Sequence, residues 1–287
     1  MRYGGIDEAG YGPTLGPLSI VGVGIDAAPG LDLARAFAGT GVRDSKTLHK
    51  PGNLAPLEQV ALGGLNWLLG QRPRTAAEVF AALGEIASER TQPWQHGAEA
   101  LALPLSATHV PLWSLSDVQP LGVRGNLIHA GEYNRFTTTS GNKADLELGA
   151  VKKLLAWVAD TTPATVVVDR LGGRRFYRDA LHGVWPDNEI AILEEAAHAS
   201  RYDICGRHVA FLVGGEGASP LTALASCIAK YARELHMVLF NRHWCAAVPG
   251  LAPTAGYPED ARRWLGALGS ARYTSIATEL VRGWPRF

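Results

Sequence analysis

Apolar positions near the start of the chain have the two-residue period of strands. Their spacing predicts strands at Tyr3–Ile6 and Leu18–Ile25, and we expect these two strands to pair as a hairpin. A third strand is predicted at Thr165–Asp169, where three consecutive valines are typical of a strand that is buried on both faces. Because this strand ends in a carboxylate, it would deliver Asp169 to an edge of the sheet.

Helical spacing of apolar residues appears in three segments. Asp145–Asp160 is predicted to be a helix that leads into the Thr165 strand. Ser219 and Pro220 are the residue types of a helix N-cap and first position, and this helix is predicted to run to about Phe240. Ala76–Arg90 is predicted to be an amphipathic helix.

The pattern is weaker over the rest of residues 50–130, which we interpret as an irregular insertion. Residues 124–143 are rich in polar groups and indicate a strand followed by a loop. The Thr-Thr-Thr-Ser run at 137–140 is suited to hydrogen bonds with phosphates, and it fits a simple turn equally well.

Composition limits the class of protein. The chain has 287 residues, 47% of them hydrophobic, which is enough for one large domain or a domain with an appendage. It has 27 basic and 27 acidic residues, and this balance argues against a purely electrostatic, non-specific binder of nucleic acid.

Cys205, Cys227 and Cys245 are widely spaced, which indicates neither a disulfide framework nor a zinc site. With no apolar run of about eighteen residues and no room for a signal peptide before the first motif, we expect a cytoplasmic protein without membrane association.

Candidate chemistry begins where the first predicted strand ends. Asp7 and Glu8 are adjacent carboxylates, and Gly10-Tyr11-Gly12 follows them directly. Charges at a strand end need either open solvent or a partner, and a divalent cation would be such a partner. Gly10 and Gly12 permit positive φ and a close approach of backbone amides to a ligand. A solvated surface turn accounts for this short motif equally well.

Three later motifs make the pattern more specific. Asp44-Ser45-Lys46 comes first, Asp169 ends the valine strand, and Glu216 precedes the helix that carries Ser226 and Lys230. In order and spacing, these motifs together with the Asp7-Glu8 motif resemble the ribonuclease HII family, which cuts at ribonucleotides embedded in DNA. The resemblance covers roughly the first fifty residues and most of residues 165–263, whereas residues 50–150 match poorly.

The resemblance implies an α/β fold, namely a ribonuclease H-like mixed β-sheet flanked by helices. Residues 1–235 would form the catalytic domain, with an insertion at about 50–130, and residues 236–287 would form a helical C-terminal extension. The implied catalytic and metal-ligating residues are Asp7, Glu8, Asp169 and Glu216. The implied substrate-binding residues are Gly10, Tyr11, Gly12, Lys46, Lys230 and Tyr257.

The implied activity is that of an endoribonuclease that hydrolyses phosphodiester bonds with two metal ions. Oxygen-only ligands favour Mg²⁺ or Mn²⁺ over zinc. The expected partner is an RNA–DNA hybrid or ribonucleotide-containing DNA, bound by a monomer. An ordinary surface lysine at Lys46 and a packing ring at Tyr257 remain open as structural alternatives.

Two positions depart from the family pattern. Tyr11 stands where ribonuclease HII has an arginine, and Glu216 stands where the family has an aspartate. Two further hypotheses therefore stay open: a structure-specific nuclease of the same fold with another substrate, and a catalytically degenerate protein that binds nucleic acid without cutting it. Metal-dependent cleavage would distinguish either enzyme from the binder. A requirement for the ribose 2′-hydroxyl would distinguish an enzyme like ribonuclease HII from another nuclease of the same fold.

Overall fold

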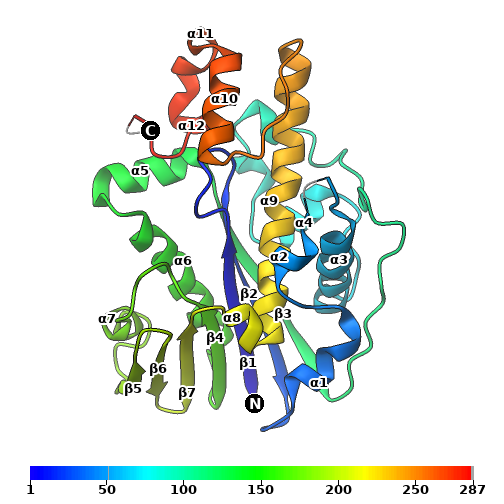
Figure 1. Ribbon diagram of the computed structural model, residues 1–287. Helices are drawn as coiled ribbons and strands as arrows, with labels where there is room; N and C mark the ends of the chain where they lie inside the picture. Colours follow the sequence, from blue (N-terminus) through cyan, green and yellow to red (C-terminus); the bar gives the residue numbers. More distant parts are fainter. Residues whose placement is uncertain (51, 286–287) are drawn as a thin grey trace.

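The predicted hairpin is part of a seven-stranded sheet in the computed structural model, which describes residues 1–50 and 52–285 (Figure 1). β1 (Arg2–Ala9) pairs antiparallel with β2 (Leu18–Ala27) and parallel with β4 (Ala164–Asp169). The strand order is β3-β2-β1-β4-β7-β6-β5. The other strands are β3 (Val118–Ile128), β5 (Ala191–Glu195), β6 (Ala199–Ile204) and β7 (Arg207–Leu212). The mixed sheet with flanking helices confirms the predicted fold class.

Helices cover both faces of the sheet. On one face, α9 (Pro220–Ala247) lies across β1 and β2 and packs with α3 (Ala55–Leu69) and α4 (Ala76–Ala82) in one hydrophobic core. On the other face, α6 (Lys143–Val158) and α7 (Arg178–His182) enclose a second core. The predicted helices at 145–160 and from Ser219 are thus present, and α9 extends seven residues beyond Phe240.

The C-terminal helices pack on the far end of α9 (Figure 1). α10 (Pro258–Leu268), α11 (Ser270–Tyr273) and α12 (Ala277–Leu280) share a third core with that end of α9, and α12 also contacts α5 (Ala130–Ser140). The expected domain boundary at 235/236 falls inside the continuous helix α9. The C-terminal segment is therefore built directly on a helix of the sheet domain. The remaining short helices are α1 (Leu33–Phe37), α2 (Ser45–Leu48) and α8 (Gly215–Ala218).

Three local predictions need correction. The helix expected over Ala76–Arg90 ends at Ala82, because Gly84 takes a φ of +87° and turns the chain away. Residues 118–128, at the end of the expected insertion, form strand β3 and pair with β2 along its length. The Thr-Thr-Thr-Ser run is the last turn of α5, where Thr137, Thr139 and Ser140 donate their hydroxyls to carbonyls of the same helix.

Among the described residues, no helix combines the length and the apolar character needed to cross a membrane.

Candidate active site

The sheet topology collects the predicted acids at one edge. β1 and β4 run parallel and their last paired residues are Ile6 and Val168, so Asp7 and Asp169 lie next to each other beyond this pair. β1 continues to Ala9 and not to the predicted end at Ile6, so Asp7 and Glu8 lie within the last residues of the strand. β7 also runs parallel to β4 and leads into α8, which carries Glu216. Ligand oxygens of Asp7, Glu8 and Asp169 lie within 4.8 Å of one another.

Helix α9 reaches this edge because β1 has a glycine at Gly5. A Cβ there would lie 2.2 Å from the backbone of Leu221 and Thr222, so only glycine permits such a close approach of the first turn of α9. Ser219 caps the helix by accepting a hydrogen bond from Thr222 N, and the Thr222 hydroxyl donates to the carbonyl of Val167 at 3.0 Å. The start of α9 is therefore fixed beside the acids.

The three clustered carboxylates are poorly solvated. Asp7 is 4% exposed; its Oδ1 accepts a hydrogen bond from the amide of Glu8 at 2.7 Å, and its Oδ2 has no partner among the described residues. Glu8 Oε2 is likewise buried and has no hydrogen-bond partner among the described residues. Burial, and then repulsion from Glu8 and Asp169, raise the pKa of Asp7 well above its usual value. Burial also raises the pKa values of Glu8 and Asp169, although the Gly215 amide donates to Asp169 Oδ1 at 2.7 Å. Buried, unpaired and mutually repelling oxygens fit a divalent cation.

Glu216 is placed differently from the other three acids. Its Oε2 accepts a hydrogen bond from the amide of Ser45 at 2.7 Å, and its Oε1 lies 3.6 Å from Nζ of Lys46. Its side chain is 8% exposed and lines the same cavity as the clustered acids. Glu216 thus connects α8 to the Asp44-Ser45-Lys46 motif at the start of α2.

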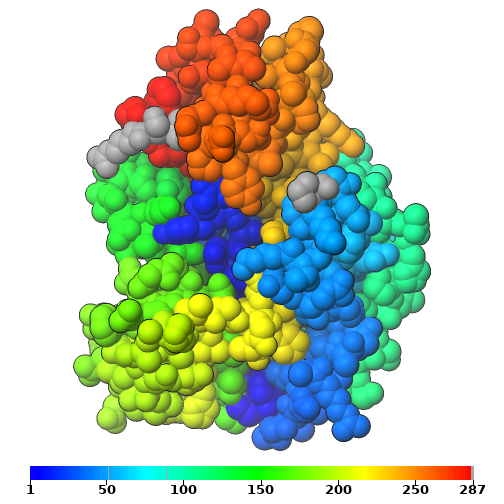
Figure 2. Space-filling model, in the orientation of Figure 1, coloured from blue at the N-terminus to red at the C-terminus, as the bar shows by residue number. Residues whose placement is uncertain are grey.

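The acids lie in a cavity of about 170 Å³. Figure 2 shows the N-terminal residues, in dark blue, at the bottom of a hollow between the green, orange and light-blue segments. Of the predicted substrate-binding residues, four line this cavity: Gly10, Lys46, Lys230 and Tyr257. The side chain of Tyr257 is 53% exposed. These four therefore line the same cavity as the acids.

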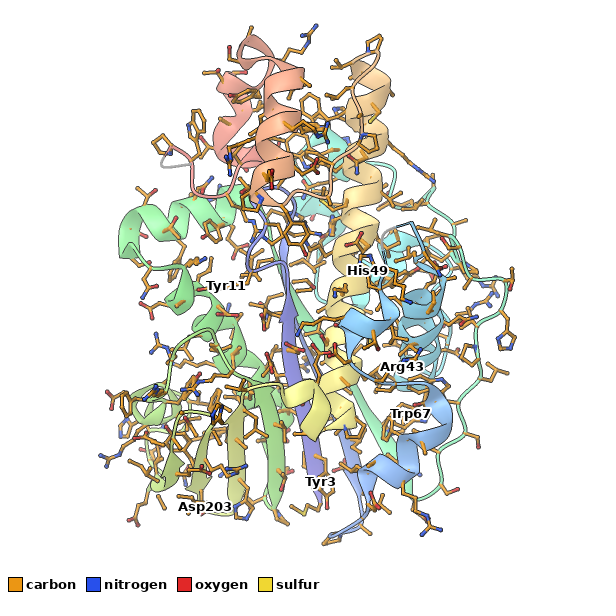
Figure 3. The ribbon with its side chains drawn as sticks, viewed as in Figure 1. Tyr3, Tyr11, Arg43, His49, Trp67 and Asp203 are labelled. Atoms are coloured by element: carbon orange, nitrogen blue, oxygen red, sulfur yellow. The ribbon has the colours of Figure 1, made fainter. Side chains whose placement is uncertain are left out.

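Tyr11 and Gly12 do not line the cavity. The Tyr11 ring packs beside the core under α6, with Nζ of Lys143 4.0 Å from its centroid (Figure 3). Of the two glycines in the turn, Gly10 has a positive φ, +91°, and exposed Gly12 does not. The positive φ that both glycines permit is thus adopted by Gly10 and not by Gly12.

Glu147, which the sequence analysis missed, is also near the acids. It is 1% exposed, and burial, then the charge of Glu8, raise its pKa to about 8. Its Oε2 is buried without a hydrogen-bond partner in the described structure. The sequence contained an indication of this position, because the helical spacing of Glu147 with Val151 and Leu154, four and seven residues later, places its carboxylate on the buried face of α6.

Arg233 is a second residue that the sequence analysis missed. It is 3% exposed, donates to the carbonyl of Ala255 at 2.8 Å, and lies 5.7 Å from the ring centroid of Tyr257. A Cβ added at Gly10 would lie 2.8 Å from Cδ of Arg233, so the Gly10 turn packs directly on the Arg233 side chain. Arg233 thus holds the Gly10 turn and the Tyr257 segment together, a contact that periodicity along α9 does not indicate.

The chain resembles known proteins in part of its sequence and in its fold. The ribonuclease HII family model matches residues 4–58, which include the Asp7-Glu8 and Asp44-Ser45-Lys46 motifs. No curated protein sequence matches the chain. Among solved structures, the ribonuclease H2 of Pyrococcus horikoshii OT3 has a TM-score of 0.55 at 17% identity, covering 100% of this chain and 95% of that one.

Two further structures are similar. Ribonuclease HII of Archaeoglobus fulgidus, solved in a complex with PCNA, has a TM-score of 0.52 at 16% identity over 99% of this chain and 95% of that one. Bst-RNase HIII in complex with Mn²⁺ has a TM-score of 0.50 at 17% identity over 99% of this chain and 66% of that one. The family match confirms the resemblance over the N-terminal motifs, and the structures share the fold.

Proposed function

Taking the chain as a divergent relative of ribonuclease HII, we propose that it is a divalent-metal-dependent endoribonuclease. Its substrates are the RNA strand of RNA–DNA hybrids or ribonucleotides embedded in duplex DNA. The family match supports an endoribonuclease of the ribonuclease H type. The observation that carries the proposal is the convergence of Asp7, Glu8 and Asp169, with buried unpaired oxygens, on one cavity.

The oxygens that would hold the metal are Asp7 Oδ2, Glu8 Oε2 and the carboxylate of Asp169, with Glu216 at the same cavity as a fourth carboxylate. An all-oxygen set is suited to Mg²⁺ or Mn²⁺. Held by these carboxylates, two such ions would supply activation of a water for attack on the phosphodiester and stabilisation of the leaving 3′-oxygen. Their positive charge would also offset the repulsion from Glu8 and Asp169, which adds to burial in raising the pKa of Asp7.

The other cavity residues bind and orient the nucleic acid in this proposal. Lys46 and Lys230 present positive charges to phosphates beside the acids. The Gly10 turn brings backbone close to the ribose, and the half-exposed Tyr257 ring offers a face on which a sugar or base stacks. Tyr11 and Gly12 lie outside the cavity, and this proposal assigns them no contact with the substrate.

The test is cleavage of three matched duplexes: DNA with a single ribonucleotide, an RNA–DNA hybrid and all-DNA, each with Mg²⁺, Mn²⁺ or chelator. We expect metal-dependent cutting of the ribose-containing strands, and loss of cutting in a folded Asp7→Asn variant. Metal-dependent cutting of all-DNA would instead support a structure-specific nuclease. Binding of the hybrid without any cutting would support the degenerate binder and overturn the proposal.

A further inference from the structure

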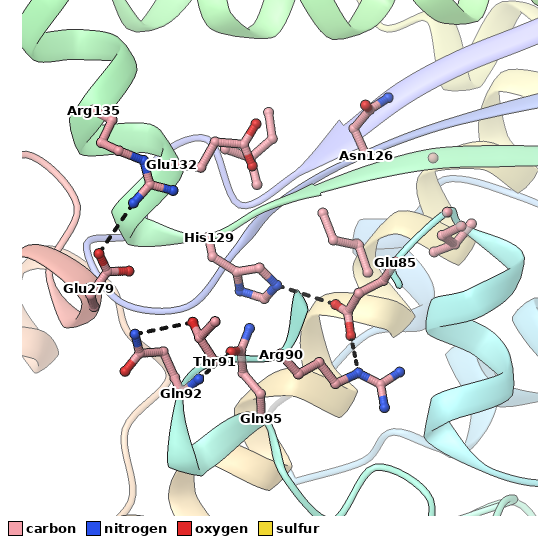
Figure 4. A pocket seen from close by; sticks show the side chains of 15 residues that line it. Glu85, Arg90, Thr91, Gln92, Gln95, Asn126, His129, Glu132, Arg135 and Glu279 are labelled. Atoms are coloured by element: carbon pink, nitrogen blue, oxygen red, sulfur yellow. Dashed lines mark hydrogen bonds and ion pairs between the residues drawn. The ribbon is translucent and has the colours of Figure 1, made fainter. Parts of the chain in front are cut away.

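A second set of metal-ligand side chains lies away from the acidic cavity. Glu85 follows α4, His129 lies between β3 and α5, and His236 is in the middle of α9. One ligand atom from each residue lies within 4.8 Å of the other two. None of the three lines the acidic cavity, whereas Glu85 and His129 line another cavity of about 430 Å³ (Figure 4).

The distances within this set are compatible with ligands around one ion, and His129 and Glu85 are also within hydrogen-bond distance of each other. Nε2 of His129 lies 3.3 Å from Glu85 Oε2, and Nε2 of His236 lies 3.2 Å from the same oxygen. A tetrahedral zinc ion with metal–ligand distances of about 2.0–2.2 Å places its ligand atoms about 3.3 Å apart. The two imidazoles and the carboxylate therefore fit a single ion with little rearrangement.

The surrounding residues hold these three side chains in place. Arg90 Nε donates to Glu85 Oε1 at 2.5 Å, and Glu85 Oε2 faces the imidazole of His129 (Figure 4). The His236 ring stacks on Phe80 with 3.9 Å between centroids. Glu99 in turn accepts a hydrogen bond from Arg90, so the guanidinium is shared between two carboxylates. The geometry is thus fixed by neighbours on several elements.

His236 is the most deeply buried of the three side chains. Its side chain is 5% exposed, and its Nε2 is buried with no hydrogen-bond partner among the described residues, despite the proximity of Glu85. A buried nitrogen without a partner is unfavourable, and a metal ion at the centre of the set would satisfy it. The polar cavity beside His129 and Glu85 provides access for the ion and for a water molecule as a fourth ligand.

We propose that Glu85, His129 and His236 form a zinc site, separate from the acidic active site, with three protein ligands and a fourth position open to the cavity. Two imidazoles and one carboxylate suit Zn²⁺, whereas Mg²⁺ requires oxygen ligands in an octahedral arrangement. The ion joins the chain after α4, the end of β3 and the centre of α9. Its first consequence is therefore stabilisation of the face of the sheet that α9 covers.

The experiment measures zinc directly on the metal-free full chain. After equilibrium dialysis against Zn²⁺, elemental analysis should give one tightly held ion per chain, which survives in Asp7→Asn and is lost in Glu85→Gln and in His129→Ala. His129 is partly exposed, so its truncation leaves the core intact. The matched control is His109→Ala, at an exposed histidine outside the set, which should retain the ion.

Two further readouts keep the proposal falsifiable if a variant does not fold. Zn²⁺ at about 100 times its Kd should raise the Tm of the wild-type chain by about 5 °C. Co²⁺ in place of zinc should give the visible absorption of a four-coordinate ion with imidazole ligands. Failure of the folded wild-type chain to retain zinc, or equal retention by His129→Ala, would overturn the proposal, and neither result bears on cleavage by the acidic site.

Discussion

Glu147 makes the stability of the metal-free protein depend on pH. Its side chain is 1% exposed, its Oε2 has no hydrogen-bond partner in the described structure, and the charge of Glu8 acts on it across the site. Burial first, and then that charge, raise its pKa from 4.5 to about 8, although Lys143 acts in the opposite direction. Replacing it by glutamine removes the ionisation and nearly preserves the shape.

The sign and size of the effect follow from linkage. The folded chain binds the Glu147 proton more tightly than the unfolded chain does, so the free energy of unfolding falls as pH rises from 4.5 to about 8. Below pH 4.5 the carboxyl group is protonated in both the folded and the unfolded chain, so it does not lower the free energy of unfolding there. At about 1.36 kcal/mol per pH unit, the interval corresponds to about 5 kcal/mol. Glu147→Gln should therefore match the wild type near pH 4.5 and exceed its stability by about 5 kcal/mol at pH 9.

The assay is urea unfolding in chelator, followed by tryptophan fluorescence at several pH values between 4.5 and 9. Differences between variant and wild type isolate Glu147 from the other buried acids, which titrate in both proteins. Glu189→Gln is the matched control, because Glu189 is exposed and should give parallel curves. If Glu147→Gln and the wild type lose stability in parallel across this range, the carboxyl group is not buried as described and the reasoning is refuted.

Three other substitutions test the packing and the substrate contacts. Gly5→Ala places a Cβ 2.2 Å from the backbone of α9 and should lower the free energy of unfolding by about 3 kcal/mol in denaturant titrations. Gly12→Ala is the control, because Gly12 has open space around it; it should cost far less, and equal losses in the two variants would contradict the close approach of α9 to Gly5. Glu58→Gln should lower the free energy of unfolding by about 3 kcal/mol or more in the same titrations, because Glu58 is fully buried and accepts hydrogen bonds from three backbone amides and the Tyr231 hydroxyl, each at 2.7 Å. An unchanged denaturation midpoint would show that these hydrogen bonds do not form. Tyr257→Ala should raise the KM for a ribonucleotide-containing duplex about tenfold, equivalent to one stacking contact, and an unchanged KM would remove this ring from the substrate site.

The sequence alone determined the elements whose pattern is local. Alternating and continuous apolar runs located β1, β2 and β4, and the Ser219-Pro220 signal located the start of α9. Through the resemblance to ribonuclease HII, the order of the acidic motifs also indicated Asp7 and Asp169 as members of one site, and the structure places both beside the last residue pair of the parallel strands β1 and β4. Periodicity records which face of an element is buried, and that information lies within the element itself.

Only the tertiary structure decided which side chains meet across elements. Glu216 contacts the amide of Ser45 from 171 positions away, and Glu85 meets His129 across 44 positions. Such pairs follow from strand order and from how closely α9 approaches the sheet, and no local pattern encodes either. The same reason explains why Glu147 was missed: its charge on an apolar helix face was visible in the sequence, but its proximity to Glu8 depends on α6 covering the face of the sheet opposite α9.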